Sequence, residues 1–250
     1  MRPVVLSARL QTVAGMVTRG NVVCDVGCDH GFTAIYLVQK EICPRALAMD
    51  LREGPLSAAG EHIAACGLEE RIETRLSDGL HKYKAGEADT LICAGMGGGL
   101  MMRILAEERE KTDSFRELVL QPQSELPQFR RFLRENGYRI QDEEILLEEG
   151  KFYQVIRAVT DWERKSQPGS VEVSDRNNDG LCKLEDRYGP VLLQKRTPVF
   201  LLFLEREEAI CEEILAKLRG QGLADDRRRE RYEEVETQLQ DCRRAQNLYN

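Results

Sequence analysis

An aspartate and two glycines lie in and directly after the first apolar run of the chain. The run 22–26 contains Asp25 and leads into a turn with Gly27 and Gly31, a D-x-G-x-x-x-G pattern followed by a second apolar segment. Glycine lets backbone come close to a ligand, and a helix that begins after such a turn offers unpaired N–H groups to acidic ligands. The pattern favours a nucleotide-type ligand, and an ordinary tight turn is the alternative.

Two more aspartates stand at the ends of later apolar runs. Asp50 closes the run 46–50 about twenty residues beyond the first turn, the spacing at which a carboxylate accepts hydrogen bonds from ribose hydroxyls. The alternative for Asp50 is an acidic strand end in solvent. Asp78 follows the run 72–76 and can accept a hydrogen bond from the exocyclic amine of a purine. A dehydrogenase site does not require this third acid, so its presence favours S-adenosylmethionine over a nicotinamide dinucleotide.

Four glycines gather in a second turn, over residues 95–99 (GMGGG), directly after the apolar run 89–94. Ligands of open parallel sheets bind at the carboxyl ends of the strands. This nearly side-chain-free stretch is therefore expected to form a ledge beside the ligand. A flexible loop is the alternative, but the helix expected over 100–108 follows at once and would fix the stretch.

These turns need parallel strands to bring them together. Strands are expected over 22–26, 46–50, 72–76, 89–94 and 118–123, with helices over 33–41, 55–66, 100–108 and 126–135 between them. Such alternation is typical of a doubly wound sheet. The runs 138–148 and 152–159 predict an antiparallel hairpin at one edge. The expected fold is therefore α/β, with a Rossmann-like, mostly parallel seven-stranded sheet.

The chain is expected to divide into three parts. Residues 1–160 form the S-adenosylmethionine-binding catalytic domain, and residues 161–190 form a linker rich in Ser, Pro, Gly, Asn and Asp. Residues 191–250 carry apolar positions at heptad-like spacing, which predicts an α-helical coiled-coil hairpin. The basic stretch 227–231 (RRRER) in this part could bind nucleic acid, but the acidic residues near it favour the interpretation that it is a solvated helix face.

Composition limits the class of protein. The 250 residues are 42% hydrophobic and can bury a sizeable core, while the net charge of −7 means that a nucleic acid would be held by a local basic patch. The eight cysteines do not form a disulfide scaffold, and the pair Cys24 and Cys28 lacks further zinc ligands. We therefore expect reduced thiols, no metal and a cytoplasmic protein. No signal peptide opens the chain, and no apolar run is long enough for a membrane.

Taken together, the motifs resemble those of the bacterial tRNA (adenine22-N1)-methyltransferases, which are class I S-adenosylmethionine-dependent enzymes. The resemblance extends from Leu6 to about Val159, and in outline over the C-terminal helices. It is carried by the segments 6–10 (LSARL), 25–30 (DVGCDH), 53–55 (EGP), 78–80 (DGL), 94–98 (AGMGG), 120–122 (LQP) and 151–153 (KFY). The chain departs from the family pattern at Cys28, where serine or threonine is usual, at Ala34, where proline is common, and at Gln123, where asparagine often stands.

The resemblance implies methyl transfer from S-adenosylmethionine to N1 of a tRNA adenine at position 22. N1 has an in-plane lone pair that can attack the methyl sulfonium directly, so alignment supplies much of the rate without a covalent intermediate. Asp29 is expected to stabilise the developing cation, and His30 to take a proton if one leaves; an anchoring role is the alternative for His30. The residues expected to hold the cofactor are Asp25, Gly27, Asp29, His30, Gly31, Asp50, Leu51, Asp78, Gly79, Gly95, Met96 and Gly97.

The tRNA must present an unpaired or flipped-out adenine, because base pairing buries N1. The residues expected to contact it are Arg9, Gly98, Arg103, Gln123, Arg130, Arg131 and Lys151. A solvated side chain is the alternative for Arg9. Two other functions stay open at this point: a methyltransferase acting on a small molecule or a protein, and a non-catalytic nucleotide-binding scaffold. The expected oligomeric state is a monomer or a homodimer.

Overall fold

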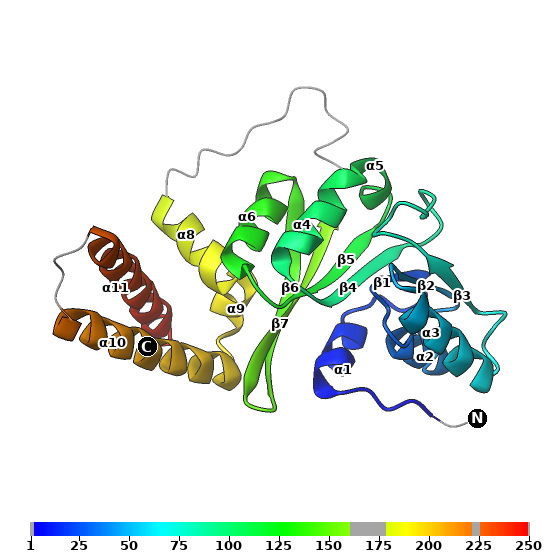
Figure 1. The fold of residues 1–250 in the computed structure, drawn as a ribbon, viewed down its shortest axis with the longest axis horizontal. Coiled ribbons are helices and arrows are strands. Elements are labelled where there is room, and N and C mark those ends of the chain that lie inside the picture. Colours follow the sequence, from blue (N-terminus) through cyan, green and yellow to red (C-terminus); the bar gives the residue numbers. More distant parts are fainter. Residues whose placement is uncertain (1–2, 161–178, 222–225, 250) are drawn as a thin grey trace. The chain divides into compact units, whose positions relative to one another are not determined.

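The computed structural model describes residues 3–160, 179–221 and 226–249 of the chain (Figure 1). The chain divides into two compact units, residues 1–176 and residues 177–250. None of the helices in the described ranges is long and apolar enough to cross a membrane. All eight cysteines lie in these ranges, and none is paired in a disulfide.

The first unit is built on a seven-stranded sheet with the strand order β3-β2-β1-β4-β5-β7-β6. The first five strands are parallel, and the β6–β7 hairpin is antiparallel. The strands are β1 (Val23–Val26), β2 (Ala46–Asp50), β3 (Ile72–Leu76), β4 (Thr90–Met96), β5 (Glu117–Pro122), β6 (Tyr138–Glu148) and β7 (Lys151–Thr160). The expected α/β fold with an antiparallel edge hairpin is therefore confirmed.

Helices cover both faces of this sheet (Figure 1). Successive strand residues point to opposite faces, so Val23 joins one apolar layer and Cys24 joins the other. Because the central strands are buried on both sides, their sequences read as continuous apolar runs. The first layer contains α1 (Ala8–Gly15), α2 (Phe32–Gln39) and α3 (Glu53–Ala65), and the second contains α4 (Gly98–Glu107) and α6 (Leu126–Glu135), with the short α5 (Arg109–Thr112) beside α4.

The strand order reverses direction between β1 and β4, which are neighbours at the centre of the sheet. The chain leaves β1 toward α2 on one face and leaves β4 toward α4 on the other face. Two loops that part in this way open a crevice beyond the carboxyl ends of the strands, where α/β proteins bind their ligands. The topology thus places the two glycine-bearing turns side by side.

The second unit is helical. Its helices are α8 (Asp179–Tyr188), α9 (Pro190–Lys195), α10 (Pro198–Gln221) and α11 (Asp226–Asn247). The helices α10 and α11 bury Cys211, Leu215, Val235 and Leu239 between them, and Arg243 of α11 forms ion pairs with two glutamates of α10. The pairing of two helices agrees with the expected hairpin, and its coiled-coil geometry stays a prediction.

The region expected to be a linker, residues 161–190, is helical in its second part because α8 lies within it. Residues 161–178 of that expected linker lie outside the described residues. Helix α8 belongs to the second unit, whose side chains Tyr188 and Phe200 lie with ring centroids 6.4 Å apart. The described residues 179–190 of the expected linker therefore belong to the helical unit, in which Leu184, Asp186 and Tyr188 of α8 are buried.

Candidate functional site

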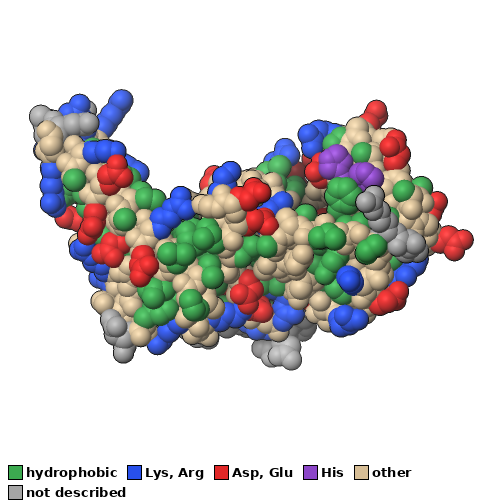
Figure 2. Space-filling model, turned by 90° about the horizontal axis from the view of Figure 1, so that it is seen from below, with side chains coloured by type: hydrophobic (Ala, Val, Ile, Leu, Met, Phe, Trp, Pro, Cys, Tyr) green, Lys and Arg blue, Asp and Glu red, His purple; other side chains and the backbone are tan. Residues whose placement is uncertain are grey.

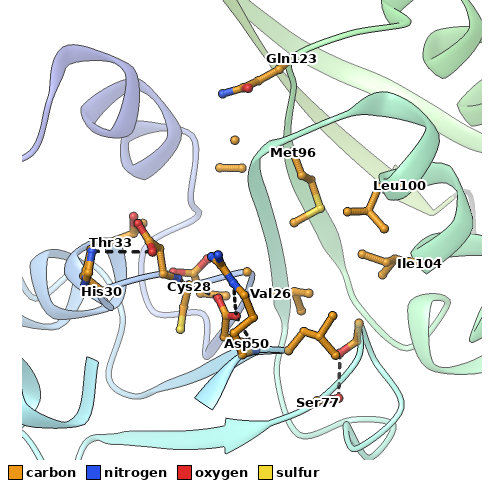
Figure 3. A pocket seen from close by; sticks show the side chains of 18 of the residues that line it. Val26, Cys28, His30, Thr33, Asp50, Ser77, Met96, Leu100, Ile104 and Gln123 are labelled. Atoms are coloured by element: carbon orange, nitrogen blue, oxygen red, sulfur yellow. Dashed lines mark hydrogen bonds and ion pairs between the residues drawn. The ribbon is translucent and has the colours of Figure 1, made fainter. Parts of the chain in front are cut away.

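A cleft of about 510 Å³ lies at the carboxyl ends of β1 to β4 (Figure 3). Most of the residues expected to hold a cofactor line it: Asp25, Gly27, Asp29, His30, Asp50, Leu51, Asp78, Gly79, Gly95 and Met96. Arg9, Arg103 and Gln123, which were expected to contact RNA, line the same cleft. Sequence-distant turns therefore meet at one site, as the parallel topology requires.

The first turn of the cleft depends on its glycines. Gly27 has φ +75°, and a Cβ added to it would lie 2.8 Å from Cε of Met96. The Gly27 and Cys28 N–H groups both donate to the carbonyl oxygen of Met49, at 2.8 and 3.0 Å. Only glycine combines this backbone conformation with so close a neighbour. At Gly27 the turn therefore lines the cleft with backbone atoms and no side chain.

Gly31 was expected to hold the cofactor, but it does not line the cleft. It adopts φ +73° at the N-terminus of α2, and its added Cβ would lie 3.1 Å from the Cβ of Ala59 in α3. It is buried and is absent from the cleft lining. Gly31 therefore permits close packing of two helices behind the cleft.

Asp50 is held in a fixed orientation at the end of β2. Its side chain accepts hydrogen bonds from the backbone N–H of Asp29, at 3.2 Å, and of Arg52, at 2.9 Å (Figure 3). A carboxylate has about four acceptor positions, so two remain for a ligand. The Asp50 carboxylate, only 7% exposed, can accept hydrogen bonds from the hydroxyls of a ribose in the cleft.

Asp25 is buried at the floor of the cleft. Its burial, together with the nearby charge of Asp50, raises the pKa of Asp25 from 3.8 to about 7. A positively charged ligand in the cleft would favour the ionised form of this carboxyl. A cation bound beside Asp25 would therefore lower the pKa of this carboxyl again.

The β3 end of the cleft carries a further carboxylate, that of Asp78. Asp78 forms an ion pair of 3.7 Å with Arg103 of α4, and both side chains are about half exposed. Gly79 has φ +49° and lies against Ile104 of α4, where an added Cβ would be 3.1 Å from a side-chain carbon. Asp78 can accept from an amine at this end while Ile104 offers an apolar wall.

The β4 end of the cleft contains an arrangement that sequence reasoning missed. Gln121 of β5 is fully buried, and its Oε1 accepts from the N–H of Gly95 at 3.1 Å and from Nη1 of Arg9 at 2.9 Å. The Arg9 guanidinium also lies over the Tyr153 ring, 5.6 Å from its centroid. A polar residue at the end of the apolar run 118–120, within a strand that is buried throughout, was the signal that could have identified Gln121.

The expected ledge at residues 95–99 is only partly open. A Cβ added to Gly98 would lie 2.4 Å from the carbonyl oxygen of Ser124, and the Gly98 N–H donates to Oγ of Ser124 at 3.3 Å. The Gly99 N–H donates to Glu125 at 2.7 Å. These bonds occupy the first backbone N–H donors of α4. Gly97 and Gly98 do not line the cleft, and Gly98 is buried. Gly98 was expected to contact the tRNA, and because it is buried this prediction is wrong.

Arg130 was expected to contact RNA, and this prediction is wrong as well. Its side chain is 1% exposed and forms a 2.8 Å ion pair with Glu143 of β6, which is fully buried. It also donates to Gln154 of β7. The hairpin covers this side of α6, so the arginine that sequence alone placed on a polar face is enclosed. Arg131 and Lys151 are exposed and lie outside the cleft lining.

Asp29 and His30 lie at the rim of the cleft. Asp29 has φ +51°, and its Oδ1 is 3.8 Å from Nε2 of His30. The His30 ring also lies 5.9 Å from the rings of Phe32 and His62, and Nδ1 of His62 is 3.1 Å from the His30 carbonyl oxygen. Purple histidine side chains accordingly gather at one place on the surface in Figure 2. Both residues are exposed enough to meet a substrate.

The three residues that depart from the family pattern, Cys28, Ala34 and Gln123, differ in their exposure. Cys28 is buried, and burial raises the pKa of its thiol, so this thiol stays protonated. Ala34 is fully buried within α2. Gln123 is exposed at one end of the pocket (Figure 3), and its N–H donates to the Met96 carbonyl oxygen at 3.0 Å. Of the three, only Gln123 presents a polar side chain at the cleft edge.

Within the described residues, no three His, Cys, Asp or Glu side chains come together as a metal-binding group. A parallel sheet with acids and glycines at its carboxyl edge is instead the arrangement of a nucleotide-ligand site. The family described as "Methyltransferase domain" matches residues 6–156, more than half of the chain. The fold and the cleft thus belong to a methyltransferase.

Individual relatives narrow this class. The chain is 34% identical over 221 residues to the tRNA (adenine(22)-N(1))-methyltransferase of Bacillus subtilis, covering 86% of this chain and 87% of that protein. The solved B. subtilis M1A22 tRNA methyltransferase TrmK has a TM-score of 0.81 at 29% identity, covering 97% of this chain and 99% of that chain. Sp1610 of Streptococcus pneumoniae, solved in complex with S-adenosyl-L-methionine, has a TM-score of 0.80 at 29% identity, covering 97% and 100%. This chain belongs to the bacterial tRNA (adenine22-N1)-methyltransferase family, as its motifs predicted.

Proposed function

We propose that this protein transfers the methyl group of S-adenosylmethionine to N1 of adenine 22 in tRNA. The observation that carries the proposal is the cleft, where the carboxylates of Asp25, Asp50 and Asp78 stand in or just after three neighbouring parallel strands. The name of the B. subtilis relative supports the same reaction and favours it over a small-molecule methyltransferase or a non-catalytic scaffold. Because the substrate is tRNA, the proposed place of action is the cytoplasm.

The residues of the cleft suit the cofactor in size and chemistry. The cleft volume of about 510 Å³ falls in the range of small-molecule sites. Asp50 accepts hydrogen bonds from the ribose hydroxyls, and Asp78 accepts one from the adenine amine. Gly27 and Gly95, which have no side chains to fill the cleft, line it between these acceptors and the β5 end. When bound there, S-adenosylmethionine supplies an electrophilic methyl sulfonium.

Asp29 and His30 are the proposed catalytic residues. The adenine ring becomes cationic as its N1 gains a methyl group, and a rim carboxylate such as Asp29 stabilises that charge. His30, 3.8 Å from Asp29, is placed to take a proton if one leaves the exocyclic amine. Most of the barrier reduction comes from holding N1 in line with the methyl group.

The tRNA has to deliver an unpaired adenine to the β4–β5 end of the cleft. Gln123 lies there and offers an amide that can hydrogen-bond to the base. The exposed cations Arg131 and Lys151 are proposed to contact the RNA backbone. A locally basic patch on an acidic protein predicts binding that weakens as the salt concentration rises.

The test is nucleoside mass spectrometry of tRNA incubated with the protein and S-adenosylmethionine that carries a deuterated methyl group. We expect labelled 1-methyladenosine in the digested tRNA and none with heat-inactivated protein. Label in another nucleoside, or no label in the tRNA, would overturn the proposal.

A further inference from the structure

Three aromatic rings meet at the mouth of the cleft. Phe32, the first residue of α2, stacks on His62 of α3, with ring centroids 4.7 Å apart and an interplanar angle of 24°. The His30 ring lies 5.9 Å from each of these rings. His30 and Phe32 line the cleft, whereas His62 does not. These three residues, which we call the aromatic rim, therefore begin in the cleft and lead outward from it.

The aromatic rim is open to solvent. Phe32 is 37% exposed, although the next two residues of α2, Thr33 and Ala34, are buried. The His30 side chain is 48% exposed, and His62 is half-buried. Only the part of the Phe32 ring that touches His62 helps to pack α2 against α3. The exposed part leaves flat apolar surface at the mouth of the cleft.

The rings of the aromatic rim are held in place before any ligand binds. Nδ1 of His62 lies 3.1 Å from the carbonyl oxygen of His30. A carbonyl oxygen can only accept, so in this hydrogen bond Nδ1 carries the hydrogen and donates it. The bond fixes the plane of the imidazole, and this plane supports the stacked Phe32 ring. A preorganised ring loses little conformational freedom when a flat ligand stacks on it.

The proposed reaction produces such a flat ligand next to the cleft. The enzyme reaches N1 of a paired or stacked adenine only after that base has been extruded, and extrusion uncovers one face of the base beside it. Aromatic side chains can stack on any uncovered base, because every base has a π face. The target adenine enters the cleft, so the nucleotide beside it stays at the mouth, where the aromatic rim lies.

We infer that the aromatic rim binds a nucleobase adjacent to the target adenine, with Phe32 stacking on that base and His62 supporting Phe32. Since tRNA is taken as the substrate, this assignment rests on the proposed function. It gives the α2–α3 side of the cleft a part in substrate binding, in addition to Gln123 on the β5 side. The proposed role of His30 in proton transfer is unchanged.

Affinity for tRNA, measured with S-adenosylhomocysteine present, tests the stacking contact. Phe32→Leu keeps an apolar side chain but removes the ring. It should weaken tRNA binding by about 5- to 150-fold, the range for stacking of one base on an aromatic side chain. The salt slope should stay at its wild-type value, because no phosphate contact is lost. Phe32→Tyr keeps the ring and should bind tRNA as the wild type does.

Tyr36→Leu is the matched control. It removes an aromatic ring from the same helix, but Tyr36 lies outside the cleft lining, near Lys40. Its affinity for tRNA should be normal. His62→Leu removes the support of Phe32 and should weaken tRNA binding less than Phe32→Leu does. Binding of S-adenosylhomocysteine by His62→Leu should be unchanged, because His62 does not line the cleft. Thermal unfolding of each variant establishes that it is folded.

A fluorescent base identifies the nucleotide that stacks. Three tRNA transcripts carry 2-aminopurine, whose fluorescence is quenched by stacking, at position 21, 22 or 23. We expect the base at position 21 or 23 to be quenched in the complex with the wild-type protein and to become brighter in the complex with Phe32→Leu. A change confined to position 22 would overturn the assignment, because the aromatic rim would then hold the target adenine itself.

The remaining outcomes separate the aromatic rim from the proposed function. Unchanged tRNA affinity in Phe32→Leu, with methyl transfer by the wild type intact, would overturn the aromatic rim alone. A wild-type protein that neither binds nor methylates tRNA would overturn the proposed function, and the aromatic rim as an RNA contact with it.

Discussion

Asp25 of β1 and Asp50 at the end of the neighbouring strand β2 interact electrostatically on the floor of the cleft. The two carboxyls differ in their surroundings. Asp50 accepts two backbone hydrogen bonds, while Asp25 is buried and has its pKa raised to about 7, chiefly by burial and further by the Asp50 charge. Because the pKa of Asp25 is raised in the folded protein, Asp25 links the stability of the protein to pH.

We expect Asp25→Asn to stabilise the ligand-free protein at alkaline pH. The folded-state pKa of Asp25, about 7, lies above the value of 3.8 that is usual for an aspartate in water, so the folded protein binds the proton more tightly than the unfolded chain. Stability is therefore lost as pH rises from about 4 to about 7, at about 1.4 kcal/mol per pH unit for one proton. Between pH 5 and pH 8 the variant should gain about 2–3 kcal/mol relative to the wild type in urea unfolding. A difference that does not change with pH would contradict the raised pKa.

Asp50→Ala should weaken binding of S-adenosylmethionine by about 10- to 100-fold, because it removes charge-assisted hydrogen bonds to the ribose. Calorimetric titration measures the affinity, and thermal unfolding checks the fold. Glu61→Gln, which neutralises an exposed carboxylate on α3, is the control and should bind normally. Unchanged affinity in Asp50→Ala would mean that another group holds the ribose.

Gly98→Ala and Gly99→Ala should behave differently although they are neighbours. The added Cβ at Gly98 meets the backbone oxygen of Ser124 at 2.4 Å, whereas at Gly99 it meets the flexible end of Glu125 at 3.0 Å. Overpacking against backbone should destabilise Gly98→Ala by about 1–3 kcal/mol. Gly99→Ala should lie within about 1 kcal/mol of the wild type in chemical unfolding. Equal stabilities would show that the chain at Ser124 can move away.

Arg130→Ala and Arg131→Ala separate stability from RNA binding. Arg130 belongs to a buried ion pair, so its removal takes the 2.8 Å arginine partner away from the buried Glu143 carboxylate and should cost about 3–5 kcal/mol in urea unfolding. Arg131→Ala should have a small effect on stability but lower tRNA affinity and reduce the salt slope by about one. A normal tRNA salt slope in Arg131→Ala would move the RNA to another surface.

The mostly parallel sheet and its antiparallel edge hairpin were predictable because the buried strands appear as apolar runs separated by turns. Asp25, Asp50 and Asp78 were predictable as cleft residues for the same reason, since parallel strands bring their carboxyl ends to one edge. Both conclusions need only the local pattern of the chain and the rules of parallel connection.

The environment of Arg130 was not predictable in this way. A polar helix face looks the same in sequence whether it meets water or a carboxylate that arrives later from a hairpin, as Glu143 does. The close approach of Ser124 to Gly98 likewise depends on how two loops meet in space. Arg9 and Gln121 lie 112 positions apart, so no local pattern relates them.

The most direct test of the central claim uses two tRNA transcripts that differ only at position 22, adenine in one and guanine in the other. Each is incubated with the protein and S-adenosylmethionine labelled in its methyl group, and the modified position is located by reverse transcription, which N1-methylation of adenine blocks. We expect label in the adenine-22 transcript, a stop next to position 22, and neither with guanine 22. Equal labelling of the two transcripts, or a stop at another adenine, would contradict the account.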